Sequence, residues 1–298
     1  MLRWSPGADE RWQDYAVEAG ADTTVLDALV EIQRGQDPGL AFRYACRVGM
    51  CGSCGVVVNG RERWACRTPL STLGPGRITV RPLYHFPVLR DLVVDMAPFT
   101  ARMRAVGAAF TPGDGERRDA RISGDSAERQ EIDEAIECIG CGLCVSACTI
   151  VAHNARFPGP AALNRAFTLQ RDSRDTARST RWGVLLSDDA LARCHGQANC
   201  TDVCPMGLAP TRSIIRLRQM ATARIFKWGP DMAPAYFSEG GYAPLALLRP
   251  AFGASRQSRD ARLRDVPLTD FPRSPVPATR RSRDRAAVPR SGSRADAR

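Results

Sequence analysis

The cysteines of this chain fall into three groups whose spacing suits iron–sulfur chemistry, and none of the eleven is left over. The first group reads C-x4-C-x2-C-x11-C, which is typical of a plant-type [2Fe–2S] site. The second reads C-x2-C-x2-C-x3-C, as in bacterial ferredoxins, and the third reads C-x5-C-x3-C with proline next. The groups are Cys46, Cys51, Cys54 and Cys66; Cys138, Cys141, Cys144 and Cys148; and Cys194, Cys200 and Cys204. The sequence therefore predicts three iron–sulfur clusters.

One ligand is missing from the third group, because Gln197 stands where a ferredoxin run would have its second cysteine. In two-cluster ferredoxins the fourth cysteine of each run binds the other cluster. This rule predicts a [4Fe–4S] ligand set, Cys138, Cys141, Cys144 and Cys204, and a three-thiolate set, Cys148, Cys194 and Cys200. A neutral amide is a poor ligand for soft iron, so the three-thiolate set predicts a [3Fe–4S] cluster. The alternative is a [4Fe–4S] cluster with Gln197, water or hydroxide on the fourth iron.

The loop around the first group is rich in glycine, at Gly49, Gly52 and Gly55. Glycine tolerates positive φ and lets backbone N–H groups approach the sulfides, which would stabilise the reduced cluster and raise its potential. Ser53 could also hydrogen-bond a sulfur, although a plain turn residue would serve equally well. The main alternative is a zinc site, but zinc ligands usually come as paired C-x2-C units separated by a longer span.

Charge and hydropathy narrow the classes of function. The net charge is +10 over 298 residues, and nearly all the positive charge is arginine, since Lys227 is the only lysine. The arginines form no basic stripe interleaved with aromatics, so we expect no nucleic-acid partner. No window approaches the ~18 apolar residues of a membrane helix, and the start MLRWSPGADE lacks the apolar core of a signal peptide. We therefore expect membrane attachment only through partners, in a reducing compartment.

Local patterns predict an α+β first domain over residues 1–105. Capping residues, turn residues and the spacing of apolar side chains define its elements. The expected elements are a helix from Thr23 or Thr24 to Gly35, strands over residues 15–18, 56–58 and 78–80, a hairpin turn at Asn59-Gly60 and a helix over residues 86–96.

The rest of the chain predicts an all-α domain and a tail. The expected elements are a linker over residues 106–127, a helical domain over residues 128–228 and a Pro/Arg-rich, mostly disordered tail over residues 229–298. Within the helical domain we expect helices over residues 160–170 and 210–225, and a helix that begins at Ser187 and ends near Cys194.

Longer stretches around the cysteines resemble the iron–sulfur subunit of succinate dehydrogenase and fumarate reductase. They are R-Y-A-C-R-V-G-M-C-G-S-C-G, F-P-V-L-R-D-L-V-V-D-M, C-I-G-C-G-L-C, F-P-G-P-A-A-L-N-R-A-F and R-C-H-G-Q-A-N-C-T-D-V-C-P-M-G-L-A-P. The resemblance covers roughly residues 1–226. Few other families join a [2Fe–2S] loop to a two-cluster ferredoxin unit in this order.

The resemblance implies an N-terminal β-grasp [2Fe–2S] ferredoxin domain followed by an all-α ferredoxin-like [4Fe–4S]/[3Fe–4S] domain. It implies single-electron transfer between the FAD of a partner flavoprotein, where succinate is oxidised, and quinone at a membrane-anchor subunit. It also implies a peripheral location on the cytoplasmic side of the inner or plasma membrane, held there by the partners. The alternative keeps the three clusters but pairs them with a paralogous flavoprotein that has a different substrate or a soluble acceptor.

Several positions depart from the family pattern. Thr149 stands where the family often has proline, and Ala152 and His153 replace a tryptophan pair that many succinate dehydrogenases carry at the quinone pocket. Gln197 stands where an aliphatic residue is common. His195 matches a family histidine beside the quinone and is the candidate quinone contact, although it could be an ordinary histidine at a helix end. The family pattern also leads us to expect a first strand near the start of the chain, and this chain begins almost inside it. This suggests a short strand or a start further upstream.

Overall fold

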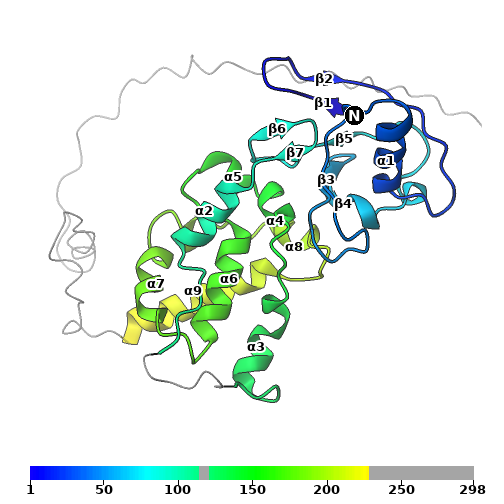
Figure 1. Cartoon of the computed structure of the whole chain (residues 1–298). Coiled ribbons are helices and arrows are strands. Elements are labelled where there is room, and N and C mark those ends of the chain that lie inside the picture. The colour runs from blue at the N-terminus through cyan, green and yellow to red at the C-terminus, as the bar shows by residue number, and fades with distance from the viewer. Residues whose placement is uncertain (114–120, 228–298) are drawn as a thin grey trace, which may run out of the picture. The chain divides into compact units, whose positions relative to one another are not determined.

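The computed structural model describes residues 1–113 and 121–227. The strands are β1 (Leu2–Arg3), β2 (Arg11–Trp12), β3 (Gly55–Val58), β4 (Arg61–Trp64), β5 (Val80–Arg81), β6 (Val88–Arg90) and β7 (Val93–Val94). The first 113 residues also contain helix α1 (Val25–Gly35), the 3-10 helices η1 (Ala65–Arg67) and η2 (Leu70–Leu73), and helix α2 (Ala97–Ala105). Residues 121–227 contain α3 (Ala127–Ile136), α4 (Leu143–Ser146), α5 (Thr149–His153), α6 (Pro160–Arg171), α7 (Arg178–Leu185), η3 (Leu191–Arg193), α8 (Asn199–Asp202) and α9 (Pro210–Lys227) (Figure 1). The predicted α+β domain followed by a helical domain is confirmed.

The first domain is built on a small antiparallel sheet in the order β4-β3-β5. Strands β3 and β4 are joined at Asn59-Gly60, where φ is 49° and 78°, as a two-residue hairpin turn requires. Val57 and Val58 are fully buried, and Gly55 pairs with Trp64 at the open end of the hairpin. The predicted hairpin is confirmed, and it brings its two ends close together.

Helix α1 begins with a capping box, in which side chains satisfy backbone N–H groups that have no partner in the first turn. The backbone N–H of Asp27 donates to Thr24 Oγ1 at 3.2 Å, and that of Thr24 donates to Asp27 Oδ2 at 3.0 Å. Leu26 and Leu29 are buried on the inner face. The helix predicted from Thr24 to Gly35 is confirmed.

Residues 86–96 form a β-hairpin, so the helix predicted there is wrong. Strand β6 pairs antiparallel with β7, and Asp91 adopts a left-handed φ of 45° between them. The buried Asp91 carboxylate accepts hydrogen bonds from Arg3 Nε at 2.8 Å and from the backbone N–H groups of Trp4 and Ala41 at 3.1 and 2.9 Å. These partners come from distant parts of the chain, and they stabilise a turn that local spacing does not reveal.

Three other predicted elements differ from the structure. Residues 15–18 are not a strand, because the strand that pairs with β1 ends at Trp12. The strand predicted over residues 78–80 begins only at Val80. The helix predicted from Ser187 is reduced to the 3-10 turn η3, because the Ser187 hydroxyl donates back to the carbonyl of Val184 at 2.8 Å instead of capping a new helix.

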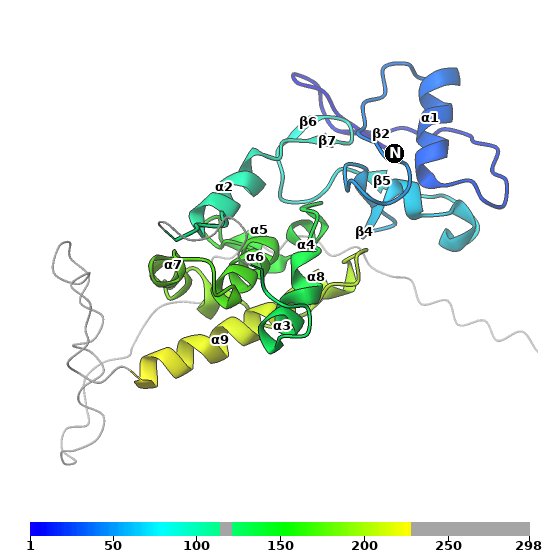
Figure 2. The same ribbon diagram turned by 60° about the horizontal axis from the view of Figure 1, so that its bottom comes forward.

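Helix α6 is the centre of the helical domain and contacts α2, α3, α4, α7 and α9 (Figures 1 and 2). It begins after Gly159, whose φ of 86° turns the chain into Pro160. Leu163 and Ala166 on its inner surface are fully buried. The helices predicted over residues 160–170 and 210–225 correspond to α6 and α9 and are confirmed.

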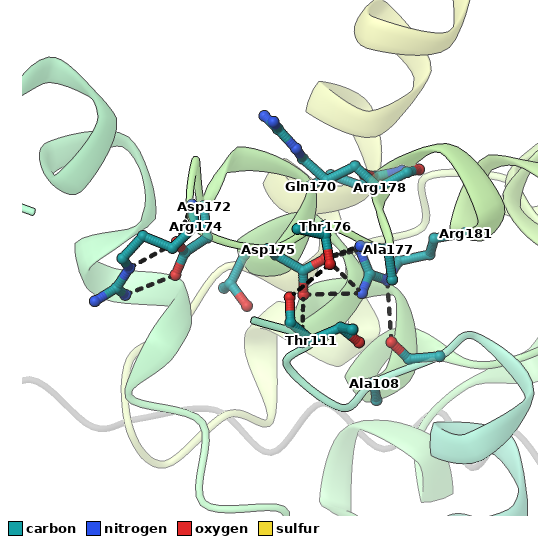
Figure 3. A network of polar contacts seen from close by, with 12 residues as sticks. Ala108, Thr111, Gln170, Asp172, Arg174, Asp175, Thr176, Ala177, Arg178 and Arg181 are labelled. Carbon is teal, nitrogen blue, oxygen red and sulfur yellow. Dashed lines mark hydrogen bonds and ion pairs between the residues drawn. The ribbon is translucent and has the colours of Figure 1, made fainter. Parts of the chain in front are cut away.

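A buried ion pair between Asp175 and Arg181 anchors the loop between α6 and α7. Its nitrogen and oxygen atoms are 3.2 Å apart, and the two side chains are 0 % and 1 % exposed. The backbone N–H of Thr111 donates to Asp175 Oδ2 at 3.3 Å (Figure 3), and Arg181 Nε donates to the carbonyl of Gly107 at 3.0 Å. The pair therefore ties the segment that follows α2 to helix α7.

Hydrogen bonds also join the β3–β4 hairpin to the helical domain. The Ser146 hydroxyl in α4 donates to Glu62 Oε1 at 2.8 Å and accepts from the backbone N–H of Tyr84 at 2.9 Å. Arg61 donates to the carbonyl of Asp202, at the end of α8, at 2.8 Å. The two domains therefore share a polar interface beside the cysteine groups.

Two predictions concern residues that are only partly described. The predicted linker over residues 106–127 is described except for residues 114–120, and the predicted disordered tail over residues 229–298 lies wholly outside the described residues. No helix in the described ranges is both long and apolar enough to cross a bilayer.

Candidate iron–sulfur cluster sites

The cysteines of the first group meet as two close pairs. Cys54 and Cys66 lie at the open end of the β3–β4 hairpin, and their Sγ atoms are 3.4 Å apart. Cys46 Sγ accepts hydrogen bonds from the backbone N–H groups of Met50 and Cys51 at 3.2 and 3.3 Å. A [2Fe–2S] core takes four thiolates on two irons, so the paired arrangement fits it.

The loop between these cysteines uses left-handed backbone where the sequence places glycine. Gly49 and Gly52 have φ of 76° and 69°, and the neighbouring Arg47 has φ of 61°. Gly55 is different, because it lies in strand β3 and has no positive φ. A Cβ at Gly55 would lie 2.7 Å from Leu143 Cδ1, so any other residue here would displace the buried side chain of Leu143 in α4.

The loops of the first two cysteine groups touch each other. A Cβ on Gly52 would lie 2.6 Å from Cys141 Cβ and 3.1 Å from Cys141 Cα. A cavity of about 190 Å³ lies beside this contact, with both Cys51 and Cys141 in its wall. The first and second sites are therefore neighbours with no side chain between their loops at this point.

The thiols of the first group differ in acidity. The Ser53 hydroxyl, with help from the backbone N–H groups of Cys46 and Ser53, lowers the pKa of Cys51 to about 6. Burial raises the pKa of Cys54 to about 12, and the neighbouring Cys66 thiol contributes in the same direction by its side chain and charge. The Ser53 hydroxyl is thus close enough to the Cys51 sulfur to influence it, which favours one of the two roles that the sequence leaves open for this residue.

The thiols of Cys138, Cys141 and Cys144 lie close enough to Cys204 for its charge to affect them. Burial is the main cause that raises the pKa of all three, and the charge of Cys204 raises each pKa further. For Cys141 the pKa reaches about 11. Buried thiolates are unfavourable without a cation, so this group suits a bound metal core that keeps the sulfurs ionised.

The third group meets Cys148 from the second. Burial raises the pKa of Cys148 and Cys200, and the charge of Cys194 contributes to both shifts. These three thiols line one cavity together with His195 and Gln197. The structure thus brings together the cysteines that the crossed ferredoxin rule groups together.

Gln197 has a protein partner for its amide oxygen. Thr149 Oγ1 donates to Gln197 Oε1 at 2.6 Å. The hydrogen bond joins two of the positions at which the sequence departs from the family pattern. One acceptor site of the Gln197 amide oxygen is therefore taken by a hydroxyl, which orients the side chain.

Helix α9 holds the peptide that carries the third group. Arg218 donates to the carbonyl of Leu191 through Nε at 2.9 Å and through Nη2 at 2.6 Å. Its Nη2 also donates to the carbonyl of Cys194. One guanidinium thus fixes the backbone on which a cluster ligand is mounted.

The donor set fits clusters better than single metal ions. Across residues 1–113 and 121–227, no three histidine, cysteine or carboxylate side chains converge closely enough to hold one ion. A structural zinc ion needs four ligands at a single point, whereas a cluster distributes its thiolates over several irons. The buried Trp64 Nε1 has no hydrogen-bond partner among the described residues, although the indole lies beside the Cys141 thiol and opposes the rise in pKa that burial causes there. Such an unpaired donor is expected where the sulfur of a bound cluster ligand accepts.

The histidines are divided between two cavities. His195 is exposed and lies in the wall of the third cysteine site. His153 lines a different cavity of about 640 Å³, together with His85 and Ala152. Thr149 and Asn199 lie in the walls of both cavities.

Two contacts near the cysteines could not be inferred from spacing. The sequence does not single out Trp64 as a site residue, and its position two residues before Cys66 is the available signal. From the sequence, Thr149 is recognisable only as a replacement for a proline that is common in the family. Its hydrogen bond to Gln197 joins residues 48 positions apart, which no local pattern reveals.

Comparison with known proteins agrees with this division of the chain. A family model for a 2Fe-2S iron-sulfur cluster binding domain matches residues 1–101. A family model for a 4Fe-4S dicluster domain matches residues 134–208.

Individual relatives are similar over most of their length. The chain is 35 % identical over 224 residues to the fumarate reductase iron-sulfur subunit of Mycobacterium tuberculosis, covering 73 % of this chain and 91 % of the relative. It is 36 % identical over 229 residues to the succinate dehydrogenase iron-sulfur subunit of Paracoccus denitrificans, covering 76 % and 88 %. A chain of the Mycobacterium smegmatis Sdh1 complex in the apo form superposes with a TM-score of 0.69 at 31 % identity, covering 77 % of this chain and 95 % of that one. This chain belongs to the family of succinate dehydrogenase and fumarate reductase iron–sulfur subunits.

Proposed function

We propose that this chain carries single electrons between the FAD of a partner flavoprotein and a quinone at a membrane-anchor subunit. The clusters it uses are [2Fe–2S], [4Fe–4S] and [3Fe–4S]. A flavin that oxidises succinate to fumarate holds two electrons, whereas each cluster accepts one. Serial one-electron carriers are therefore needed between flavin and quinone, and the protein's task is to hold them close together.

The single observation that carries the proposal is the contact between the first two cysteine loops. Gly52 approaches Cys141 so closely that a Cβ would collide with the Cys141 side chain. Electron tunnelling falls steeply with distance, so cluster loops in direct contact suit transfer from one core to the next. Cys144 and Cys200, from the second and third sites, are also close enough for the charge of Cys200 to raise the pKa of Cys144 after the dominant effect of burial.

The ligand assignment is part of the proposal. The [2Fe–2S] core takes the first group, the [4Fe–4S] core takes a second set, and the [3Fe–4S] core takes a third. The sets are Cys46, Cys51, Cys54 and Cys66; Cys138, Cys141, Cys144 and Cys204; and Cys148, Cys194 and Cys200. Support comes from the neighbourhoods described above, in which burial and mutual charge group the same thiols.

The proposal that the third site holds three irons and not four rests on Gln197. Its amide oxygen accepts from Thr149 at 2.6 Å, which supports a side chain that is held by the protein and does not ligate iron. His195 lies in the wall of the same cavity and is the proposed quinone contact. An imidazole N–H there would donate to a quinone carbonyl.

Location and domain limits complete the proposal. As a member of this family the chain is a peripheral subunit of a membrane complex, and we place it on the cytoplasmic side of the inner or plasma membrane. We keep residues 1–105 as the [2Fe–2S] domain and 128–228 as the two-cluster domain, which is supported by the family-model matches over residues 1–101 and 134–208.

The test is the cluster content of the anaerobically purified complex. We expect about nine irons and about ten acid-labile sulfides per copy of this chain, from one cluster of each kind. Low-temperature EPR of the oxidised complex should show a three-iron signal, and succinate should then reduce the clusters. A pale protein that releases no sulfide in acid would overturn the proposal.

A second candidate keeps the clusters and changes the electron acceptor. The observation that favours it is the cavity of about 640 Å³ lined by Ala152 and His153, the positions at which many succinate dehydrogenases carry tryptophans. Complex that is reduced by succinate but fails to reduce any quinone, while it still reduces a soluble acceptor, would support this candidate over the first.

A further inference from the structure

Trp64 spans the contact between the first two cluster loops. It closes strand β4 directly before the turn that carries Cys66, and it is 5 % exposed. Its Cζ3 atom lies 3.4 Å from the position that a Cβ would take at Gly49, within the [2Fe–2S] loop. Trp64 pairs across the hairpin with Gly55, and a Cβ at Gly55 would lie 3.7 Å from the carbonyl oxygen of Cys141, a proposed [4Fe–4S] ligand. Residues directly opposite in an antiparallel pair share one face, so the indole and Cys141 lie on the same side of the hairpin.

The indole N–H has no hydrogen-bond partner in the described part of the chain. Trp64 Nε1 is buried, and no acceptor among the described residues meets the distance and angle of a hydrogen bond to it. Buried polar groups are almost always hydrogen-bonded, and leaving a buried donor unpaired is unfavourable. The Cys141 thiol lies beside the indole and is the acceptor available to it.

The surroundings prevent the indole from turning away. Gly49 and Gly52 bring the [2Fe–2S] loop against Trp64 and Cys141, and Gly55 pairs with Trp64 across the hairpin. The carbonyl of Trp64 accepts from Thr68 Oγ1 at 2.8 Å, which fixes its backbone. The donor is therefore held beside one sulfur by packing on several sides.

We propose that the Trp64 indole N–H is a hydrogen-bond donor to the Cys141 thiolate and selectively raises the reduction potential of the [4Fe–4S] cluster. This inference rests on the proposed function, because it requires that Cys141 binds this cluster. Reduction adds one electron and no bond changes, so the charge on the thiolate sulfurs increases. A donor at one of these sulfurs stabilises the reduced state more than the oxidised state.

The test is an EPR-monitored redox titration of the anaerobic complex with the Trp64→Phe variant. Phenylalanine retains an aromatic ring but lacks the N–H. Loss of a hydrogen bond to a charged sulfur should change the equilibrium constant for reduction by up to about tenfold, which corresponds to about 59 mV towards lower potential. The potentials of the [2Fe–2S] and [3Fe–4S] clusters should remain unchanged in the same sample.

Trp182→Phe is the matched control. Trp182 is also buried, at 7 % exposed, but it lies in helix α7 and is not part of the cysteine sites. Its replacement should leave all three potentials at the wild-type value. Equal [4Fe–4S] potentials in wild type and Trp64→Phe would overturn the inference, as would a shift of all three potentials together.

A second measurement needs no variant. Pulsed EPR of the reduced wild-type complex, exchanged into D2O, should show an exchangeable deuteron coupled to the [4Fe–4S] cluster from the indole N–D. The absence of any coupling from this site after complete exchange would contradict the inference. Absence of the cluster signals themselves would instead contradict the proposed function, so the two failures are distinguishable.

Discussion

At the scale of single residues, small polar groups set the properties of the sulfurs. Ser53 is the clearest case in the first loop, because its hydroxyl is the largest cause that lowers the pKa of Cys51. The same hydrogen bond would stabilise the more negative, reduced [2Fe–2S] cluster. Tuning of this cluster therefore depends in part on one side chain that is not a ligand.

We predict that Ser53→Ala lowers the midpoint potential of the [2Fe–2S] cluster. A hydrogen bond contributes about 0.5–1.5 kcal/mol, which corresponds to roughly 20–60 mV for one electron. The measurement is an EPR-monitored redox titration of the complex. Ser71→Ala is the control, since the Ser71 hydroxyl donates to the carbonyl of Ala21 and does not touch a cysteine. Equal [2Fe–2S] potentials in wild type and Ser53→Ala would exclude this role.

Gln197 offers a prediction about cluster type. Replacement by cysteine supplies the missing thiolate, so Gln197→Cys should convert [3Fe–4S] into [4Fe–4S]. The three-iron EPR signal of the oxidised complex should disappear, and the iron content should rise by about one per chain. Gln197→Leu, which adds no ligand, should retain the signal. If the leucine variant also loses it, the glutamine has a role in holding the three-iron cluster.

At the level of elements, the Asp175–Arg181 pair is the most deeply buried ion pair in the described part of the helical domain. We predict that Asp175→Ala destabilises the protein by about 3–5 kcal/mol, because Arg181 would be left buried and unpaired. The thermal midpoint should fall by roughly 10 °C, as measured by loss of visible cluster absorbance. Arg77→Ala is the control, because its ion pair with Asp14 has side chains that are 72 % and 66 % exposed. It should change stability by less than about 1 kcal/mol. Equal midpoints for the two variants would disprove the anchoring role.

Elements with local signals could be predicted, and those stabilised by distant partners could not. Helix α1 has its cap at Thr24 and an apolar face of fixed period, and the β3–β4 turn has Asn59-Gly60, so both are encoded within a few residues. The β6–β7 hairpin is different. Its turn at Asp91 depends on Arg3 and Ala41, which lie 88 and 50 residues away, and a helical spacing of apolar residues misled the prediction.

The candidate site also has one part that the sequence predicts and another part that it does not. The cysteine groups are identifiable because each spacing reflects the shape of one cluster. The contacts that connect the sites depend on tertiary structure, as between Gly52 and Cys141 or Thr149 and Gln197. Sequence alone therefore identifies which clusters are held, and the fold identifies how closely their loops approach.

In the molecule as a whole, the distance between the first two cluster sites depends on Gly52, which lies where the loops of the two domains meet. We predict that Gly52→Ala pushes the [2Fe–2S] loop away from Cys141, since the new Cβ would lie 2.6 Å from Cys141 Cβ at a φ of 69°. Electron transfer between the first two clusters should become slower, and their magnetic interaction in EPR should become weaker. Rapid-mixing reduction by succinate with EPR detection measures both effects.

Gly60→Ala separates collision from backbone strain. Gly60 also has a positive φ, of 78°, but a Cβ there would meet nothing within 4 Å. This variant should bear the strain alone, with electron transfer at the wild-type rate. If both variants slow the transfer equally, the contact between the loops is not the cause.

The hydrogen bonds from Arg218 to the carbonyls of Leu191 and Cys194 fix the backbone of the third cysteine group to helix α9. The same helix ends in Ile225 and Phe226, which are 56 % and 84 % exposed. Helix α9 therefore connects an exposed apolar surface of the subunit directly to the peptide that carries Cys194.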